Sequence, residues 1–167
     1  MVGEISYGIA RCSLGSILIA RTDKGICAIS LGDAPDRLRE DLERRFPGAT
    51  FHRVSVTEDE LLGRALALVE SPKDKGVVPL DLHGTPFQKR VWQALRDIGP
   101  GYTTTYAGIA ARIGAPRAVR AVARACAANP IAVAIPCHRV IRSDGAISGY
   151  RWGIHRKQAL LEREAVA

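Results

Sequence analysis

Residues 105–130 decide the fold of the C-terminal half, and they read TYAGIAARIGAPRAVRAVARACAANP. Thr105 is a favourable N-cap for a helix over 106–113, and Gly114 follows where a helix end favours a positive φ. A proline then allows a second helix to start, which we expect over 117–128. Two short helices joined through a glycine are typical of a helix-turn-helix, so the stretch predicts this motif.

The second helix of this pair has two different faces. At 100° per residue, arginine and alanine gather on one face, at Arg117, Arg120, Ala121, Arg124 and Ala128. The opposite face carries Val119, Val122 and Cys126, so Cys126 is expected to be an inert core residue. The arginine face offers no Asn, Gln or Glu to read base edges in a major groove. It therefore favours close contact with DNA without sequence choice.

The charge distribution points to the same half of the chain. Residues 1–85 hold 11 basic and 13 acidic side chains, whereas residues 86–167 hold 13 basic and 4 acidic ones. The C-terminal half thus has a net charge of +9 and the N-terminal half a net charge of −2, which together give the +7 of the chain. Lysine and arginine release counterions from phosphate, so nucleic acid is the first candidate partner.

The N-terminal half is predicted to be a small sheet with helices beside it. Short β-branched runs predict strands over 5–12, 16–21, 26–31 and 50–56, and apolar stripes at helical spacing predict helices over 35–46 and 57–70. Asp33 is expected to cap the first helix, and a capping box at 57–60 to open the second. Residues 71–82, with two prolines and a glycine, predict a connector.

The remaining helices belong to the C-terminal half. A capping box formed by Thr85 and Gln88 predicts a helix over 86–98 that buries Val91, Trp92 and Leu95. A basic helix is expected over 155–164. We therefore predict an α+β protein with two domains, residues 1–82 and 83–167.

The cysteines raise the question of chemistry. Cys12, Cys27, Cys126 and Cys137 are widely spaced with no CxxC pair, which favours free thiols in a reducing compartment. Neither a membrane span nor a secretory signal is visible. Cys137 has His138 beside it, and a thiol becomes a nucleophile when a base or a positive charge favours its thiolate. A structural cysteine and a solvated histidine are the alternatives, and spacing alone leaves the choice open.

Residues 136–140, Pro-Cys-His-Arg-Val, resemble the active-site signature of the O6-alkylguanine-DNA alkyltransferases. Further matches to this family are Asn129-Pro130, Tyr106, Arg120, the run Ser148-Gly149-Tyr150-Arg151-Trp152-Gly153, and Glu164. The resemblance spans residues 4–167. It implies a ribonuclease H-like N-terminal domain with a small antiparallel sheet, and a mostly helical, winged-helix-like C-terminal domain that binds DNA and transfers the alkyl group.

The resemblance also implies a role for each matching residue. Cys137 would be the alkyl acceptor, His138 a base acting through water, and Glu164 the group that holds this histidine. Asn129 would brace the active-site turn, and Tyr106 would assist at the guanine oxygen and rotate a phosphate. Arg120 would fill the space of the flipped base, beside Ala121, Arg117 and Arg124 at the DNA. Val140, Ser148, Gly149, Tyr150, Arg151 and Trp152 would form the alkylguanine pocket.

The implied function is repair by direct reversal. The chain would flip O6-alkylguanine, and O4-methylthymine too, out of double-stranded DNA from the minor groove and take the alkyl group once and irreversibly. A cytoplasmic monomer without cofactor or metal is expected, because the cysteines and histidines of the N-terminal half lack the spacing of the zinc site found in some relatives. The alternative is a helix-turn-helix DNA-binding or regulatory protein without alkyl transfer. A cysteine hydrolase would need an oxyanion hole, for which no motif is visible.

Overall fold

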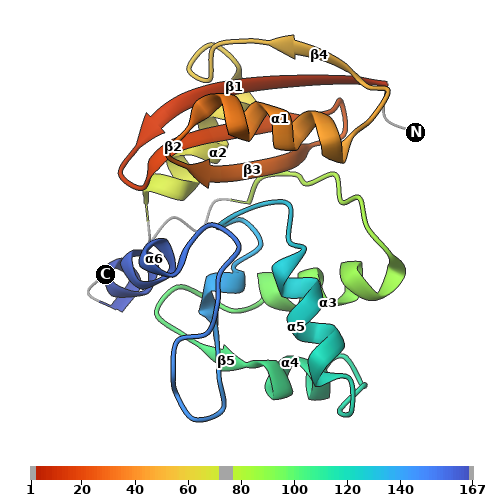
Figure 1. The fold of residues 1–167 in the computed structure, drawn as a ribbon, viewed down its shortest axis with the longest axis vertical. Helices are drawn as coiled ribbons and strands as arrows, with labels where there is room; N and C mark the ends of the chain where they lie inside the picture. Colours follow the sequence, from red (N-terminus) through yellow and green to blue (C-terminus); the bar gives the residue numbers. More distant parts are fainter. Residues whose placement is uncertain (1–2, 72–76, 166–167) are drawn as a thin grey trace. The chain divides into compact units, whose positions relative to one another are not determined.

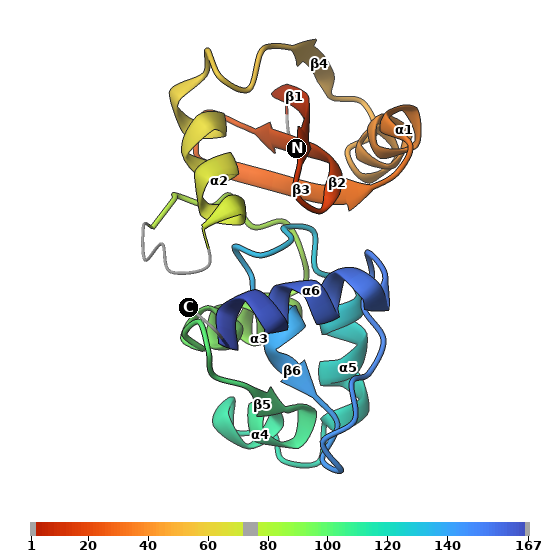
Figure 2. The ribbon, with the colours of Figure 1, turned by 90° about the vertical axis from the view of Figure 1, so that its left-hand side faces the viewer.

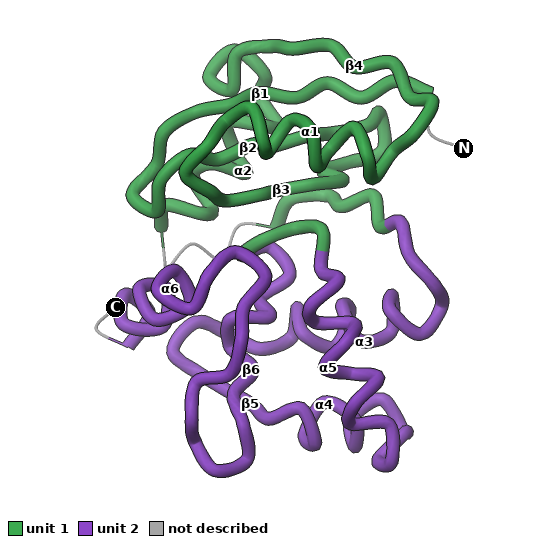
Figure 3. The backbone as a smooth tube through the Cα atoms, viewed as in Figure 1, with its two compact units in different colours: residues 1–82, 130–132 green, residues 83–129, 133–167 purple. Residues whose placement is uncertain are grey.

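The computed structural model describes residues 3–71 and 77–165. The chain forms two compact units, coloured separately in Figure 3: residues 1–82 with 130–132 make unit 1, and residues 83–129 with 133–167 make unit 2. Of the expected connector over 71–82, residues 72–76 lie outside the described residues.

Unit 1 is built on a four-stranded sheet in the order β3-β2-β1-β4 (Figure 1). Its strands are β1 (Glu4–Cys12), β2 (Gly15–Arg21), β3 (Ile26–Gly32) and β4 (Thr50–Arg53). The first three pair antiparallel as consecutive hairpins, but β4 runs parallel to β1. The sheet is therefore mixed, and the expectation of an antiparallel sheet was wrong for β4, because helix α1 (Pro35–Arg45) carries the chain across before β4 begins.

Two helices cover this sheet on opposite faces, α1 on one and α2 (Glu60–Glu70) on the other (Figure 2). The central strand β2 is consequently buried on both faces, with Ile17, Leu18 and Ile19 fully inaccessible. Leu38, Leu42 and Phe46 pack in the core on the α1 side, as their helical spacing predicts.

Both predicted caps in unit 1 were misplaced. Ala34, rather than Asp33, is the N-cap of α1 and makes no side-chain cap hydrogen bond. At α2 the cap is Asp59, whose carboxylate accepts a hydrogen bond from the Leu62 amide at 3.0 Å, so the helix starts three residues later than the predicted box at 57–60. At α2 both Thr57 and Asp59 have side chains that can cap a helix, so the sequence does not decide between them, whereas at α1 no side chain caps the helix.

Unit 2 has a helical core made by α3 (Pro86–Arg96), α4 (Tyr106–Arg112) and α5 (Val119–Ala127). The predicted capping box of Thr85 and Gln88 opens α3, and Val91, Trp92 and Leu95 are fully buried as expected. The Trp92 indole donates to the Ala125 carbonyl at 2.9 Å, which fastens α3 to α5.

The predicted helix-turn-helix is formed by α4 and α5. Thr105 caps α4 through the Gly108 amide, and Gly114 follows the helix end with φ of 77°. The second helix starts at Val119, two residues later than expected, so Arg117 lies in the turn before it.

In the rest of unit 2, the active-site signature of residues 136–140 ends at a short strand that pairs with one other strand. The two-residue strands β5 (Thr104–Thr105) and β6 (Val140–Ile141) pair in parallel, with a 3-10 turn over Cys137–Arg139 just before β6 and helix α6 (Ile154–Ala165) at the end. The α+β fold class is thereby confirmed. No helix among the described residues is long and apolar enough to span a membrane.

Candidate active site

Cys137 lies at the start of the 3-10 turn, with only 5% of its surface exposed. The side-chain amide of Asn129, itself fully buried, donates to the Cys137 sulfur at 3.1 Å and to the Ile135 carbonyl at 2.8 Å. Val133 upstream has φ of 69°, a strained conformation for a β-branched residue that costs about 1–3 kcal/mol. Such strain persists only where packing enforces it, and here Val133 is buried. The Asn129 side chain and the packing around Val133 therefore hold the segment that leads to the thiol.

Behind the thiol, Glu164 of α6 binds two residues of the signature. Its carboxylate lies 2.8 Å from Nε2 of His138 and accepts two hydrogen bonds from the Arg139 guanidinium, at 2.9 and 2.8 Å. Burial alone would raise the Glu164 pKa, but hydrogen bonds from these two partners outweigh it and lower the pKa to about 2. Glu164 is therefore a carboxylate at neutral pH.

The state of His138 follows from this arrangement. Burial lowers the pKa of its imidazole, against the opposing effect of Glu164, so the ring is neutral at pH 7. With Nε2 donating to the carboxylate, the lone pair resides on Nδ1. Nδ1 is buried and has no hydrogen-bond partner among the described residues. The site thus holds a neutral imidazole whose basic nitrogen is available.

Lys157 supplies a positive charge that the sequence analysis missed. This α6 side chain is fully buried, and its ammonium donates to the Val140 carbonyl at 2.7 Å and the Ser148 hydroxyl at 3.0 Å. Burial lowers the pKa of Lys157. Burial also raises the Cys137 pKa to about 11, and the Asn129 hydrogen bond followed by the Lys157 charge are the main opposing effects.

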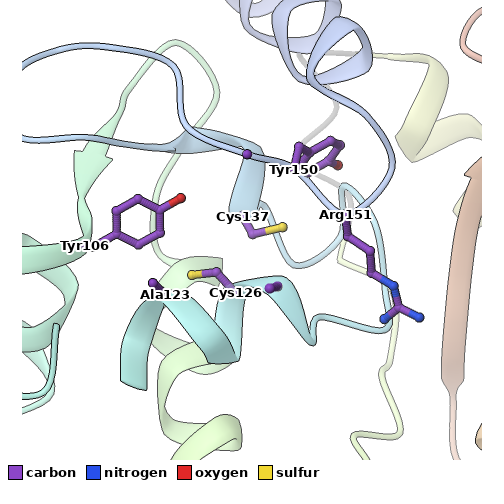
Figure 4. Close-up of a pocket in the computed structure, with 8 residues that line it drawn as sticks. Tyr106, Ala123, Cys126, Cys137, Tyr150 and Arg151 are labelled. Atoms are coloured by element: carbon purple, nitrogen blue, oxygen red, sulfur yellow. The ribbon is translucent and has the colours of Figure 1, made fainter. Parts of the chain in front are cut away.

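A pocket of about 330 Å³ opens beside the thiol (Figure 4). Its lining is Tyr106, Ala123, Cys126, Ala127, Cys137, Gly149, Tyr150 and Arg151. Small side chains of α5 form one wall, and residues 149–151 form another. In Figure 4 the rings of Tyr106 and Tyr150 lie to either side of Cys137. The prediction for Cys126 was incomplete, because this core residue also lines the pocket; its spacing from Ala123 and Ala127 on one helix face was the available signal.

The predicted pocket residues divide into two groups. Gly149, Tyr150 and Arg151 line the cavity, whereas Ser148, Val140 and Trp152 stand behind it. The Ser148 hydroxyl hydrogen bonds the Tyr106 hydroxyl, Val140 is fully buried, and the Trp152 ring packs edge-on against Tyr150 with centroids 5.3 Å apart. Ser148, Val140 and Trp152 therefore support the residues that line the cavity.

Four of the five predicted DNA-contacting residues do not line this cavity, whereas the fifth, Tyr106, does. Arg120 and Arg124 are exposed on α5, Ala121 is half-buried beside them, and Arg117 is exposed in the preceding turn. The pocket is lined by other positions of the same helix, so α5 presents an arginine surface and a pocket wall at once. Among the described residues, no group of three or more His, Cys, Asp or Glu side chains could hold a metal.

Comparison with known families matches both halves of the chain. Residues 86–166 match the profile "6-O-methylguanine DNA methyltransferase, DNA binding domain", and residues 5–71 match "6-O-methylguanine DNA methyltransferase, ribonuclease-like domain". The two profiles together cover most of the sequence.

Individual relatives agree with these profiles. The chain is 47% identical over 161 residues to the bifunctional transcriptional activator/DNA repair enzyme Ada of Escherichia coli, covering 96% of this chain but 46% of that protein. The inducible methylated-DNA–protein-cysteine methyltransferase of Bacillus subtilis is 39% identical, with 87% of this chain and 82% of the relative covered. The chain therefore spans about half the length of Ada and most of the Bacillus protein.

A solved structure supports the same relationship. The Mycobacterium tuberculosis OGT, crystallised in complex with DNA, superposes with a TM-score of 0.74 at 37% identity, covering 96% of this chain and 93% of that one.

Proposed function

Because the chain belongs to the 6-O-methylguanine DNA methyltransferase family, we propose that it repairs DNA by moving an alkyl group from O6 of guanine to Cys137. One observation carries the proposal: a thiol held by Asn129 lies in a pocket, in the turn that also carries His138, and His138 is bound to Glu164 of α6. An acceptor thiol, a neutral base and a carboxylate that orients the base are the groups that nucleophilic catalysis by cysteine requires.

The transfer exchanges one proton for one alkyl group. Nδ1 of His138 removes the Cys137 proton by way of a bridging water, and the thiolate attacks the alkyl carbon in line. The C–O6 bond breaks with its electron pair going to guanine, while a C–S bond forms. Tyr106 donates a hydrogen bond to the departing oxygen. Guanine gains one proton as it leaves and the thiol has lost one, so the number of protons is unchanged.

The product explains why the reaction stops at one turnover. A thioether is not displaced by water or by a second base, so each molecule accepts one alkyl group and is consumed. No cofactor enters this sequence of steps. A free thiol is the essential reagent, and Cys137 forms no disulfide, so the reducing cytoplasm is the compartment that suits the reaction.

DNA recognition is assigned to the exposed arginines of α5 and of the turn that precedes it. Double-stranded DNA would meet Arg117 and Arg124 through its phosphates, and small Ala121 would allow close approach of the helix. Arg120 would enter the stack as the damaged nucleotide leaves it. Flipping costs a few kcal/mol and is easiest where damage has already weakened pairing, which favours alkylated guanine over the normal base.

The test uses a duplex that contains one O6-methylguanine. The wild-type protein should restore guanine and carry the methyl group on the peptide that contains Cys137. A Cys137→Ala variant should still bind the duplex but restore nothing. Restoration of guanine by this variant would refute the proposal, and so would a wild-type protein that leaves the lesion intact.

A further inference from the structure

We infer that Arg151 fastens the two walls of the Cys137 pocket together and so restricts the reaction to small alkyl groups. The inference rests on the proposed function and goes beyond it, because it assigns selectivity among adducts to one side chain. Arg151 acts through Asn129 and is a positioning residue.

The hydrogen bonds around Asn129 are the basis of this inference. The Arg151 guanidinium donates to the Asn129 backbone carbonyl at 2.8 Å, and the Asn129 side chain donates to the Cys137 sulfur. Asn129 directly follows Ala128, the C-cap of α5. One charged hydrogen bond therefore joins the wall formed by residues 149–151 to the end of the helix that forms the facing wall.

The position of this bond, one residue beyond the C-cap of α5, makes it favourable. Carbonyls at a helix C-terminus carry the negative end of the macrodipole, so an arginine that donates there is stabilised. The Arg151 guanidinium also lies over the Trp152 ring, 5.4 Å from its centroid, which limits the directions it can take. Its geometry is fixed from two sides.

The outer wall needs such a fastening. Residues 142–147 are exposed, and no helix or strand is formed between β6 and α6. Lys157 binds the start of the wall through Ser148 and Gly149, and Tyr106 binds Ser148. Arg151 provides the corresponding tie at the far end of the wall, on the side of α5.

The size of the pocket connects this bond to selectivity. A volume of about 330 Å³ is at the lower end of the range for small-molecule sites, roughly 300–1,000 Å³. A purine with a methyl group leaves little spare room, so a benzyl group must push residues 149–151 outward. That movement lengthens the bond from Arg151 to Asn129, and a bulky substrate therefore reacts at a disadvantage that a small one does not meet.

A separate property of Arg151 gives an independent readout. Its positive charge is one of the weaker effects that lower the pKa of the Cys137 thiol. Replacing Arg151 by a neutral residue should move the pH profile of the reaction to higher pH, whereas Arg151→Lys should leave the profile unchanged. An arginine that merely stabilised the fold would not produce this difference.

The experiment measures single-turnover rates with two substrates, a duplex containing O6-methylguanine and O6-benzylguanine as the free base. Arg151→Met, which keeps a long unbranched side chain at the cavity but cannot donate, should raise the ratio of the benzyl rate to the methyl rate about tenfold, the value of one charged hydrogen bond. Arg151→Lys should return the ratio toward that of wild type. Arg142→Met, which removes an exposed arginine of the same loop paired with Asp144, is the matched control and should leave the ratio unchanged.

The ratio is measured within one preparation, so a variant that folds incompletely still gives a valid answer. An unchanged ratio in Arg151→Met, or the same change in Arg142→Met, would overturn the inference and leave methyl transfer by the wild type standing. A wild-type protein that transfers no methyl group would overturn the proposed function itself.

Discussion

Cys137 lies where a thiolate is costly to form. Burial raises the pKa of its thiol to about 11, so the anion is scarce at neutral pH. The Asn129 amide and the Lys157 ammonium oppose this effect, and His138 offers a basic nitrogen in the same turn. The Cys137 thiol therefore stays protonated until it reacts, which suits a protein that can react only once.

Replacing Lys157 by methionine should slow methyl transfer by about tenfold at pH 7, the effect of roughly one pKa unit on the thiolate population. Loss of the positive charge raises the thiol pKa, which is already about 11, so the deficit should stay near tenfold from pH 6 to 10. Single-turnover rates measure the deficit and the pH dependence of Cys137 alkylation by iodoacetamide measures the thiol pKa, with Lys89→Met on α3 as the control. A deficit without a rise in the thiol pKa would show that Lys157 does not act through the charge of the thiol.

Replacing Glu164 by glutamine should affect both stability and rate. The change removes the carboxylate that Arg139 and His138 share, which should cost about 3 kcal/mol of unfolding free energy. Transfer should slow about a hundredfold because the imidazole loses its orientation. Urea denaturation and single-turnover assays test the two effects, and Glu162→Gln, an exposed neighbour on α6, should change neither.

At the scale of residues, sequence predicted the reacting groups better than their surroundings. Cys137 and His138 could be singled out because they are adjacent in the chain. The shared binding of Glu164 by Arg139, and the approach of Lys157 from α6, depend on how distant segments pack. No periodicity in the sequence carries that information.

Among the elements, α5 combines two tasks that its sequence pattern separates only in part. Its exposed arginines face away from the core, and Ala123, Cys126 and Ala127 line the pocket. The alanine and arginine composition predicts the first surface. The pocket wall could have been suspected from the spacing of Ala123, Cys126 and Ala127. The sequence does not show, however, that Cys137 lines the same pocket.

Replacing Arg124 by alanine should weaken DNA binding to all sequences alike. If Arg124 neutralises one phosphate, the slope of log K against log salt should fall by about 0.9. Fluorescence titrations of two unrelated duplexes over a range of salt concentrations measure the slope, with Arg96→Ala on α3 as the control. A loss that depends on the sequence of the duplex would assign Arg124 to base reading instead.

The boundaries of elements were predicted less well than their existence. Helix α4 follows its Thr105 cap and its glycine, because both signals are local. The start of α5, the cap of α2 and the parallel pairing of β4 depend on competition between neighbouring positions or on the path of the chain across the sheet. Val133 in the left-handed region could not be expected at all, since its side chain disfavours that conformation.

For the whole molecule, the buried charges of unit 2 predict a loss of stability in acid. The folded pKa values of both His138 and Glu164 are lowered, the latter from 4.5 to about 2. Each group then binds fewer protons when folded than when unfolded, so its contribution is complete above its unfolded pKa and is lost as the pH falls. The loss should begin below about pH 6.5 through His138 and deepen below about pH 4.5 through Glu164.

Urea denaturation at pH 8, 6 and 4 measures this dependence. A molecule with a net charge of +7 also gains general repulsion in acid, and Glu164 itself raises the His138 pKa, so the comparison is made in a His138→Gln background. There, adding Glu164→Gln should reduce the stability that is lost between pH 6 and 4. Equal losses with and without Glu164→Gln would mean that the Glu164 pKa is not lowered in the folded state.

The most direct test of the account counts methyl groups on the protein. After incubation with an excess of duplex containing O6-methylguanine, the intact mass should rise by one methyl group in place of one hydrogen and then stay constant. The added group should map to Cys137. Cys126→Ala, which removes the other thiol of the pocket, should behave as wild type, whereas Cys137→Ala should gain nothing. A methyl group on Cys126, or more than one per molecule, would contradict the account.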